Sequence, residues 1–154
     1  MKTRTILLTL AFCLAGVMAC FADDANVGTW KLNEGKSKVP AGAPKNTKVV
    51  YTAEGGQYRC VVDGLDGTGK PLHNEWTGKF DGKDYPLVGD STADTRAVKM
   101  VSKGHYTLAN KKAGKPTTTG TIEMSADGKT RTLTTHGSDK SGKPVTAVFV
   151  YEKQ

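Results

Sequence analysis

The sequence predicts an all-β protein, built as a single antiparallel up-and-down β-barrel of about 8–10 strands with a signal peptide in front of it. Two observations carry this prediction. Polar and apolar residues alternate with a period of two along short segments, which is typical of strands that bury one face. Turn residues rich in glycine and lysine separate these segments at intervals of roughly ten residues, and no segment of the mature chain shows a helical period.

The start of the chain has the features of an export signal. Lys2 and Arg4 precede a mostly apolar run over residues 6–17, and small residues surround positions 19–22. The apolar run is too short for a convincing membrane-spanning helix. We therefore expect a signal peptide over residues 1–22 that is removed during export.

Residues 23–154 form the predicted barrel domain, a monomer with no transmembrane segment that is exported to the bacterial periplasm or secreted. An alternative is lipoprotein processing at Cys20, since a small alanine precedes that cysteine. The whole chain has a formal net charge of +7, of which Lys2 and Arg4 carry two charges, so about +5 stays on the mature domain. A positive domain favours anionic partners.

The elements of this barrel follow from the pattern in order. A short strand over residues 27–32 leads into a proline-containing loop over residues 33–45. The clearest alternation covers residues 72–80, where Asn74 shares one face with large apolar residues, and a glycine turn at residues 81–83 follows. The other predicted strands are residues 47–53, 57–63, 84–88, 94–101, 105–110, 116–125, 130–136 and 145–152.

A simple meander places its connections alternately at the two ends of the barrel. The predicted loops at one end are 33–45, 64–70, 89–93, 111–115 and 137–144, and the tight turns at the other end are 54–56, 81–83, 102–104 and 126–129. The loop end resembles a mouth, and three Gly-Lys-Pro units, beginning at Gly69, Gly114 and Gly142, each start a strand from it. Lysines outnumber acids there; they are Lys36, Lys38, Lys45, Lys70, Lys111, Lys112, Lys115, Lys140 and Lys143.

Two stretches carry a resemblance to known proteins. The triplet Gly28-Thr29-Trp30 is similar to the Gly-x-Trp with which lipocalins open, and the long first loop resembles their lid. The chain thus resembles a lipocalin-like, calycin-type barrel, although it lacks the Thr-Asp-Tyr loop of lipocalins and their helix before the last strand. Over its mature length it is also similar to small exported bacterial proteins of an uncharacterised family. Those proteins open with Gly-Thr-Trp-Lys-Leu-Asn and carry a Gly-Lys-Phe-Asp-Gly-Lys-Asp-Tyr-Pro hairpin.

The pattern argues against catalysis, metal binding and nucleic-acid binding. His73, His105 and His136 lie on three different strands, and none has further ligands at metal-binding spacing on an inward face. The chain has no phosphate loop, nucleophile elbow or zinc-protease motif. Aromatic residues do not interleave with lysines on a common face, as stacking on bases requires. We expect no enzyme activity, no catalytic or metal-binding residues, no cofactor and no nucleic-acid partner.

Two arginines lie on faces that the alternation turns inward. Arg96 shares its face with Val98, and Arg131 shares its face with Leu133. A buried guanidinium needs a partner, and arginine binds carboxylate or phosphate groups in a bidentate fork. The acid group of a ligand is one candidate partner, and an internal acid is another. The resemblance to lipocalins implies a third arrangement, in which one arginine stacks on one of the two tryptophans and caps the closed end.

The expected function is binding of a small amphipathic, anionic ligand in or at the mouth of the barrel. Arg96 and Arg131 are the predicted polar anchors, because small-molecule sites combine apolar walls with a few polar groups. The predicted apolar wall consists of Trp76, Phe80, Tyr85, Met100 and Tyr106. The alternative is an envelope interaction protein with a filled barrel, whose basic rim binds anionic surface polymers. Small barrels can be packed or hollow, so the sequence leaves both functions open.

Overall fold

The chain forms ten β-strands and one short helical turn in a computed structural model that describes residues 24–139 and 141–154. The predicted signal peptide and Cys20 lie outside the described residues. The elements are β1 (Gly28–Leu32), η1 (Glu34–Lys36), β2 (Lys45–Glu54), β3 (Gln57–Leu65), β4 (Pro71–Gly78), β5 (Asp81–Val88), β6 (Thr95–Ser102), β7 (His105–Lys112), β8 (Lys115–Met124), β9 (Thr130–Ser138) and β10 (Pro144–Lys153).

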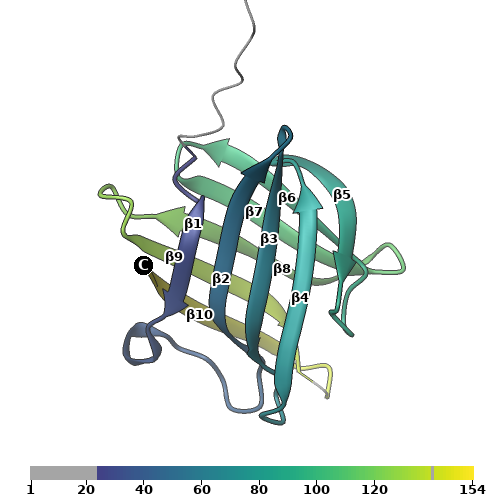
Figure 1. The fold of residues 1–154 in the computed structure, drawn as a ribbon. Helices are drawn as coiled ribbons and strands as arrows, with labels where there is room; N and C mark the ends of the chain where they lie inside the picture. The colour runs from purple at the N-terminus through teal and green to yellow at the C-terminus, as the bar shows by residue number, and fades with distance from the viewer. Residues whose placement is uncertain (1–23, 140) are drawn as a thin grey trace, which may run out of the picture.

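The strands form one closed antiparallel barrel in which each strand pairs with its neighbours in sequence (Figure 1). β1 closes the barrel against β10, where Trp30 lies opposite Lys153 and Leu32 lies opposite Tyr151. Closure leaves no open sheet edge of the kind that invites aggregation. The prediction of a single all-β, up-and-down barrel is therefore confirmed, with ten strands.

Because successive strands run in opposite directions, their connections alternate between two ends. We call one end the mouth; its connections are residues 33–44, 66–70, 89–94, 113–114 and 139–143. We call the other end the base; its connections are residues 55–56, 79–80, 103–104 and 125–129. Figure 1 shows the long 33–44 connection along the bottom and the β2–β3 turn at the top. The first described residues also reach the barrel at the base, where β1 begins.

Two predicted turns were misplaced. The predicted loop at 111–115 is a two-residue turn, Ala113-Gly114, whose residues have φ of 49° and 76°. Two successive positive φ angles give a tight hairpin that matches the twist of its strands, so β7 and β8 extend further than expected.

The predicted turn at 81–83 lies inside β5, and residues 79–80 make the connection instead. Phe80 turns into the barrel and stacks on Tyr58, so the chain changes strand before Asp81. β4 and β5 then pair at only two positions. Leu87 N–H points to β6, where it bonds to Asp94. Position 86 therefore faces β4, and Pro86 has no N–H to donate there.

Large side chains fill much of the barrel. Trp30, Trp76, Tyr51, Tyr106 and Tyr151 are all almost completely buried. Cys60, predicted as a small buried residue, is 1% exposed. The buried charged residues of the described chain are Arg96 and Arg131, so the interior is apolar apart from a few polar groups. Among the described residues, no helix is long and apolar enough to cross a membrane.

Candidate functional site

Arg96 lies inside the barrel on β6, in the alternation that also buries Val98. Its side chain is 6% exposed, and its Nε donates a 2.9 Å hydrogen bond to Oδ1 of Asn110 on β7. The Trp76 indole donates to the Arg96 carbonyl at 2.9 Å, which fixes the backbone at this point. The terminal amino groups of Arg96 bond to none of the described residues and are not sealed from solvent. Four of the five N–H donors of this guanidinium thus have no hydrogen-bond partner among the described residues.

Arg131 on β9 is 2% exposed and has more partners than Arg96. Its Nε donates to Oδ1 of Asn26 at 3.0 Å. Its guanidinium carbon lies 5.3 Å from the ring centre of Tyr151 and 5.6 Å from that of Tyr51. Such cation–π contacts stabilise a desolvated guanidinium. Arg131 therefore stacks on tyrosines of β2 and β10, the two strands that flank β1, and its buried Nη1 has no hydrogen-bond partner.

An acid lies near Arg131 at the base. Asp24 Oδ1 accepts hydrogen bonds from the Asn26 backbone N–H and from the Tyr106 hydroxyl, at 2.9 and 2.6 Å. Asn26 therefore links this carboxylate to Arg131, although no ion pair forms directly. No ion pair involving Arg96 occurs among the described residues either, and it has no comparable link to an acid. The two arginines thus differ in how far the protein itself balances their charge.

The pKa values of two buried tyrosines are affected by the charges of both arginines. Burial raises the pKa of Tyr151 to about 12, and the positive charges of Arg131 and Arg96 oppose that rise. Burial also raises the pKa of Tyr51, and the same two guanidiniums again oppose it. Both hydroxyls therefore lie within the electric field of both arginines. The positive charge of Arg131 acts on both hydroxyls more strongly than that of Arg96.

Asn74 is a further polar residue of the interior that the predicted site did not include. It lies on the inward face of β4, is 3% exposed, and its Oδ1 is buried without a hydrogen-bond partner. No described residue bonds to its amide nitrogen. The alternation places Asn74 on the inward face of its strand, between apolar residues. A polar residue on a face predicted to be buried was therefore the sequence feature that could have identified it as a site residue. Asn110, which orients Arg96, shows the same feature, because it is a polar residue on the inward face of β7.

The structure brings four of the five predicted wall residues together. Phe80 lies 5.2 Å from Tyr106 and 6.2 Å from Trp76 between ring centres, and Trp76 lies 6.1 Å from Tyr85. These rings pack on one another around the β4–β5 connection at the base. Met100, the fifth residue, is 40% exposed near the end of β6. It still pairs with the buried Tyr106, but it lies near the base end of β6, where the strand leaves the core.

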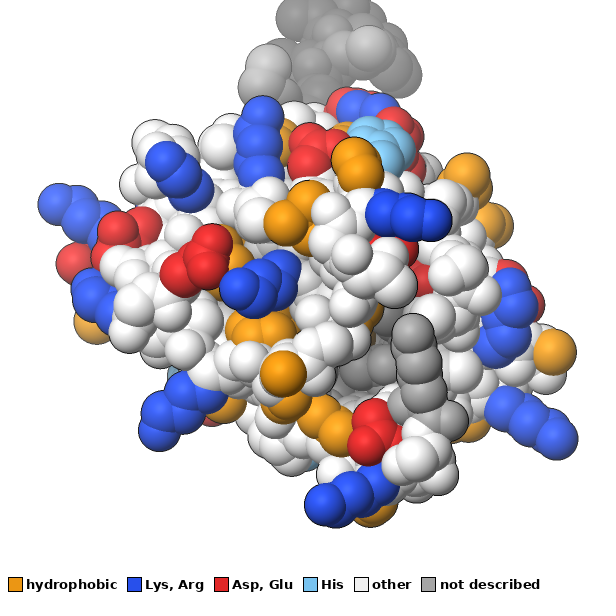
Figure 2. Space-filling view, turned by 90° about the horizontal axis from the view of Figure 1, so that it is seen from below, with side chains coloured by type: hydrophobic (Ala, Val, Ile, Leu, Met, Phe, Trp, Pro, Cys, Tyr) orange, Lys and Arg blue, Asp and Glu red, His pale blue; other side chains and the backbone are white. Residues whose placement is uncertain are grey.

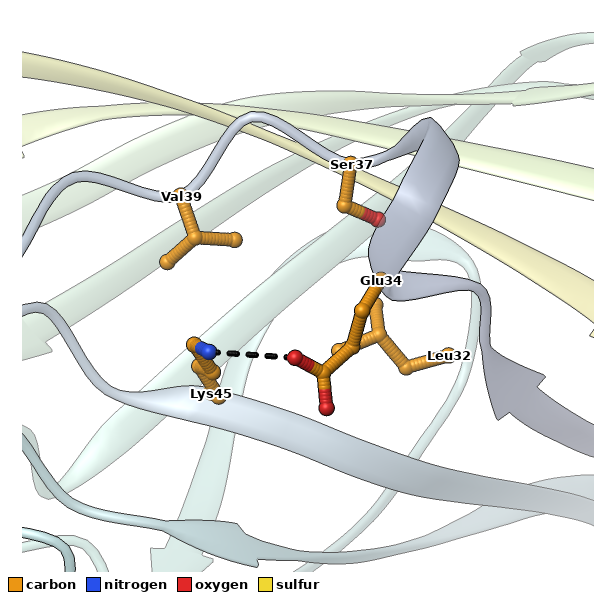
Figure 3. A pocket seen from close by; sticks show the side chains of 5 residues that line it. All are labelled: Leu32, Glu34, Ser37, Val39 and Lys45. Atoms are coloured by element: carbon orange, nitrogen blue, oxygen red, sulfur yellow. Dashed lines mark hydrogen bonds and ion pairs between the residues drawn. The ribbon is translucent and has the colours of Figure 1, made fainter.

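The two best-formed hollows lie outside this interior. One, of about 100 Å³, is at the mouth between the end of β1 and the start of β2, and an ion pair of 3.2 Å between Lys45 and Glu34 spans it (Figure 3). The other, of about 430 Å³, is a shallow groove on the outer wall of β6–β9. Among the residues that line this groove, Leu108 and Gly120 are the ones at inward strand positions. Arg96, Arg131 and Asn74 line neither hollow. Neither hollow therefore belongs to the interior around the two arginines.

The mouth carries a basic rim. Figure 2 looks onto this end and shows Lys and Arg side chains spread around it, with hydrophobic side chains between them near the centre. Lys36 pairs with Glu152 at 3.0 Å, and Lys45 pairs with Glu34. Other rim lysines are exposed without an ion pair among the described residues, including Lys70, Lys115 and Lys143. Lys140 of the predicted rim lies outside the described residues.

The histidines lie away from the interior. His73 is on the outer face of β4, and His105 and His136 are outside the core. No group of three His, Cys, Asp or Glu side chains that could hold a metal ion occurs among the described residues. Neither a protein-family model nor a curated protein matches this sequence.

Proposed function

We propose that the protein is an exported, non-enzymatic binding protein that holds a small amphipathic, anionic ligand inside the mouth half of the barrel. The observation that carries the proposal is Arg96. This guanidinium is buried, has no acid partner among the described residues, and keeps its terminal amino groups free. Leaving a charge buried without a partner costs several kcal/mol, and a bound carboxylate or phosphate would offset that cost.

The neighbours of Arg96 suit this role. Asn110 holds Nε, so the guanidinium is oriented before a ligand arrives, and preorganisation of this kind favours affinity. Arg131, nearer the base, adds a second positive charge to the interior without needing to touch the ligand. The apolar part of the ligand would contact inward residues of neighbouring strands, which include Leu32, Val62, Leu72, Leu87 and Leu108. The packed rings of Trp76, Phe80, Tyr85 and Tyr106 would form the floor towards the base.

The proposal also covers the family to which the barrel belongs and the compartment to which the protein is exported. A lipocalin-like barrel that binds its ligand from the mouth accords with the closed antiparallel architecture. Export through the signal peptide at residues 1–22, to the periplasm or beyond, belongs to the same proposal, as does a monomeric state. Lipid attachment at Cys20 is the alternative mode of export, in which the base, where the described chain begins, would face the membrane.

The test is native mass spectrometry of the protein exported and purified from bacterial cells, compared with its denatured mass. We expect a discrete extra mass that leaves on denaturation. Arg96→Met should lose it, whereas Lys99→Met, which removes a charge from the exposed face of the same strand, should keep it. Equal native and denatured masses, even after incubation with a lipid and metabolite extract, would contradict ligand binding.

A second function is favoured by the packed interior. If the buried aromatic residues leave no usable space, the exposed rim lysines become the main chemical feature of the mouth. The protein would then be an envelope interaction protein that binds anionic surface polymers. Replacing Lys70, Lys115 and Lys143 together by glutamine should abolish binding to such a polymer in this case, and Arg96→Met should not affect it.

A further inference from the structure

Asn74 has no partner for its amide, although it lies inside the barrel. Its Oδ1 is buried and accepts no hydrogen bond, while the other inward amides, Asn26 and Asn110, each hold an arginine. Buried polar groups in folded proteins are nearly always bonded, so each exception calls for an explanation. An acceptor that has no donor within the protein is explained if a bound ligand supplies the donor.

Asn74 is linked to the strand of the proposed anchor through Trp76. It lies two residues from Trp76 on the same face of β4, a Cα separation of about 7 Å in a strand. Trp76 in turn donates its indole N–H to the carbonyl of Arg96. Trp76 therefore connects the face of β4 that carries Asn74 to the backbone of Arg96. The free groups of Arg96 are donors only, whereas the sealed atom of Asn74 is an acceptor.

The positive charge of the interior determines which amide atom of Asn74 is left unbonded and which kind of hydrogen-bond donor can bind to it. Arg96 and Arg131 are the buried charged residues of the described chain. Turning the amide over would seal an unbonded N–H₂ group in a positively charged interior, so the oxygen is the atom to satisfy. A ligand ammonium would add a third positive charge, and a neutral hydroxyl avoids that repulsion.

On the basis of the proposed function, we propose that the ligand is a hydroxy acid. Its carboxylate binds the terminal amino groups of Arg96, and its hydroxyl donates to Oδ1 of Asn74. Arg96 supplies the affinity for acids in general, and Asn74 supplies the selectivity for those that carry a hydroxyl. A site built to bond a hydroxyl discriminates strongly against an analogue that lacks it, because the buried acceptor is then left empty.

The experiment uses pairs of acids that differ only in a hydroxyl: glycolate and acetate, lactate and propionate, and mandelate and phenylacetate. Binding to the full exported protein is measured by titration calorimetry, after unfolding and refolding to remove any resident ligand. We expect the hydroxylated member of at least one pair to bind about tenfold tighter or more. Asn74→Leu should keep the binding of both members and reduce their ratio to about one. Val61→Ala, on the outward face of β3 opposite Glu75, should leave both affinities and their ratio unchanged.

Each outcome separates the two proposals. Acids that bind equally well with and without a hydroxyl would overturn the assignment of Asn74 and leave the anionic site standing. A hydroxyl preference that persists in Asn74→Leu would also overturn it. Failure of all six acids to bind would overturn the hydroxy-acid assignment, and a resident mass that is retained in Arg96→Met would overturn the anionic site itself.

Discussion

Asp63 and His73 face each other across β3 and β4, with 2.7 Å between Oδ1 and Nδ1. The other ring nitrogen of His73 lies 3.2 Å from Glu75, which also pairs with Arg59 at 2.7 Å. The imidazole therefore lies between two carboxylates on the outer wall, and its hydrogen bonds to Asp63 and then to Glu75 raise its pKa. The same bonds favour the charged form of the ring.

This arrangement predicts a pH dependence of stability. The folded pKa of His73 lies above its unfolded value of about 6.5, so the stabilisation is complete below that value. It is lost as the pH rises through the raised folded pKa. Urea unfolding between pH 5 and pH 9, together with NMR titration of the ring, measures it. His73→Gln should flatten this part of the profile, and His105→Gln, at an exposed position on β7, should not.

A second prediction concerns Asn26, which is fully buried at the base and accepts from Arg131 Nε. A hydrogen bond to a charged group contributes about 1.5–3 kcal/mol, so Asn26→Ala should lower the free energy of unfolding by about that amount. Thr52→Val removes the bond that the exposed Thr52 hydroxyl donates to the exposed Glu54 carboxylate and should cost less than about 1 kcal/mol. Urea denaturation followed by tryptophan fluorescence compares the two. Equal effects would contradict a structural role for the Asn26–Arg131 contact.

The alternation of residues was enough to predict the barrel and the burial of both arginines. Arg96 and Arg131 occupy inward positions beside Val98 and Leu133, as the period of two requires. Met100 continues the same period and is nonetheless 40% exposed. Met100 still pairs with the buried Tyr106, but β6 leaves the core from Lys99 onwards, and the alternation alone does not predict where a strand leaves the core.

The partners of Arg131 could not be predicted from local pattern. Its two tyrosines come from β2 and β10, which are distant in sequence, and Asn26 precedes the first strand where no period exists. Local turn chemistry was easier to predict. Asp66 accepts from the backbone N–H groups of Thr68 and Lys70, as expected of a turn aspartate, and Asp139 repeats these bonds with Ser141 and Lys143. The two loops share the order Asp-x-Thr/Ser-Gly-Lys-Pro, which explains two of the three Gly-Lys-Pro units.

A third prediction tests how the β4–β5 connection is packed. A Cβ at Gly78 would lie 2.6 Å from the rings of both Tyr85 and Trp76. Gly78→Ala should therefore displace these rings and destabilise the protein by about 1–3 kcal/mol, as overpacking of a core does. Gly35→Ala, at an exposed site with an ordinary φ and a nearest contact of 3.5 Å, is the matched control and should be close to neutral. Near-ultraviolet circular dichroism and urea unfolding give the two readouts, and unchanged spectra in Gly78→Ala would contradict the packing described.

The last prediction follows from the empty acceptor at Asn74. An unsatisfied buried polar group costs about 1–3 kcal/mol, and leucine has the same number and branching of side-chain heavy atoms as asparagine without the polar groups. In the ligand-free protein, Asn74→Leu should therefore raise the free energy of unfolding by a similar amount. Thermal unfolding of the refolded, ligand-free protein measures this, and saturating hydroxy acid should reverse the order by stabilising the wild-type chain more than the variant. If Asn74→Leu destabilises the ligand-free protein instead, the amide has a partner when empty, such as an ordered water, and its buried position is structural. Gain of stability with loss of hydroxyl selectivity would show that the barrel keeps a destabilising residue because its ligand completes the hydrogen bond.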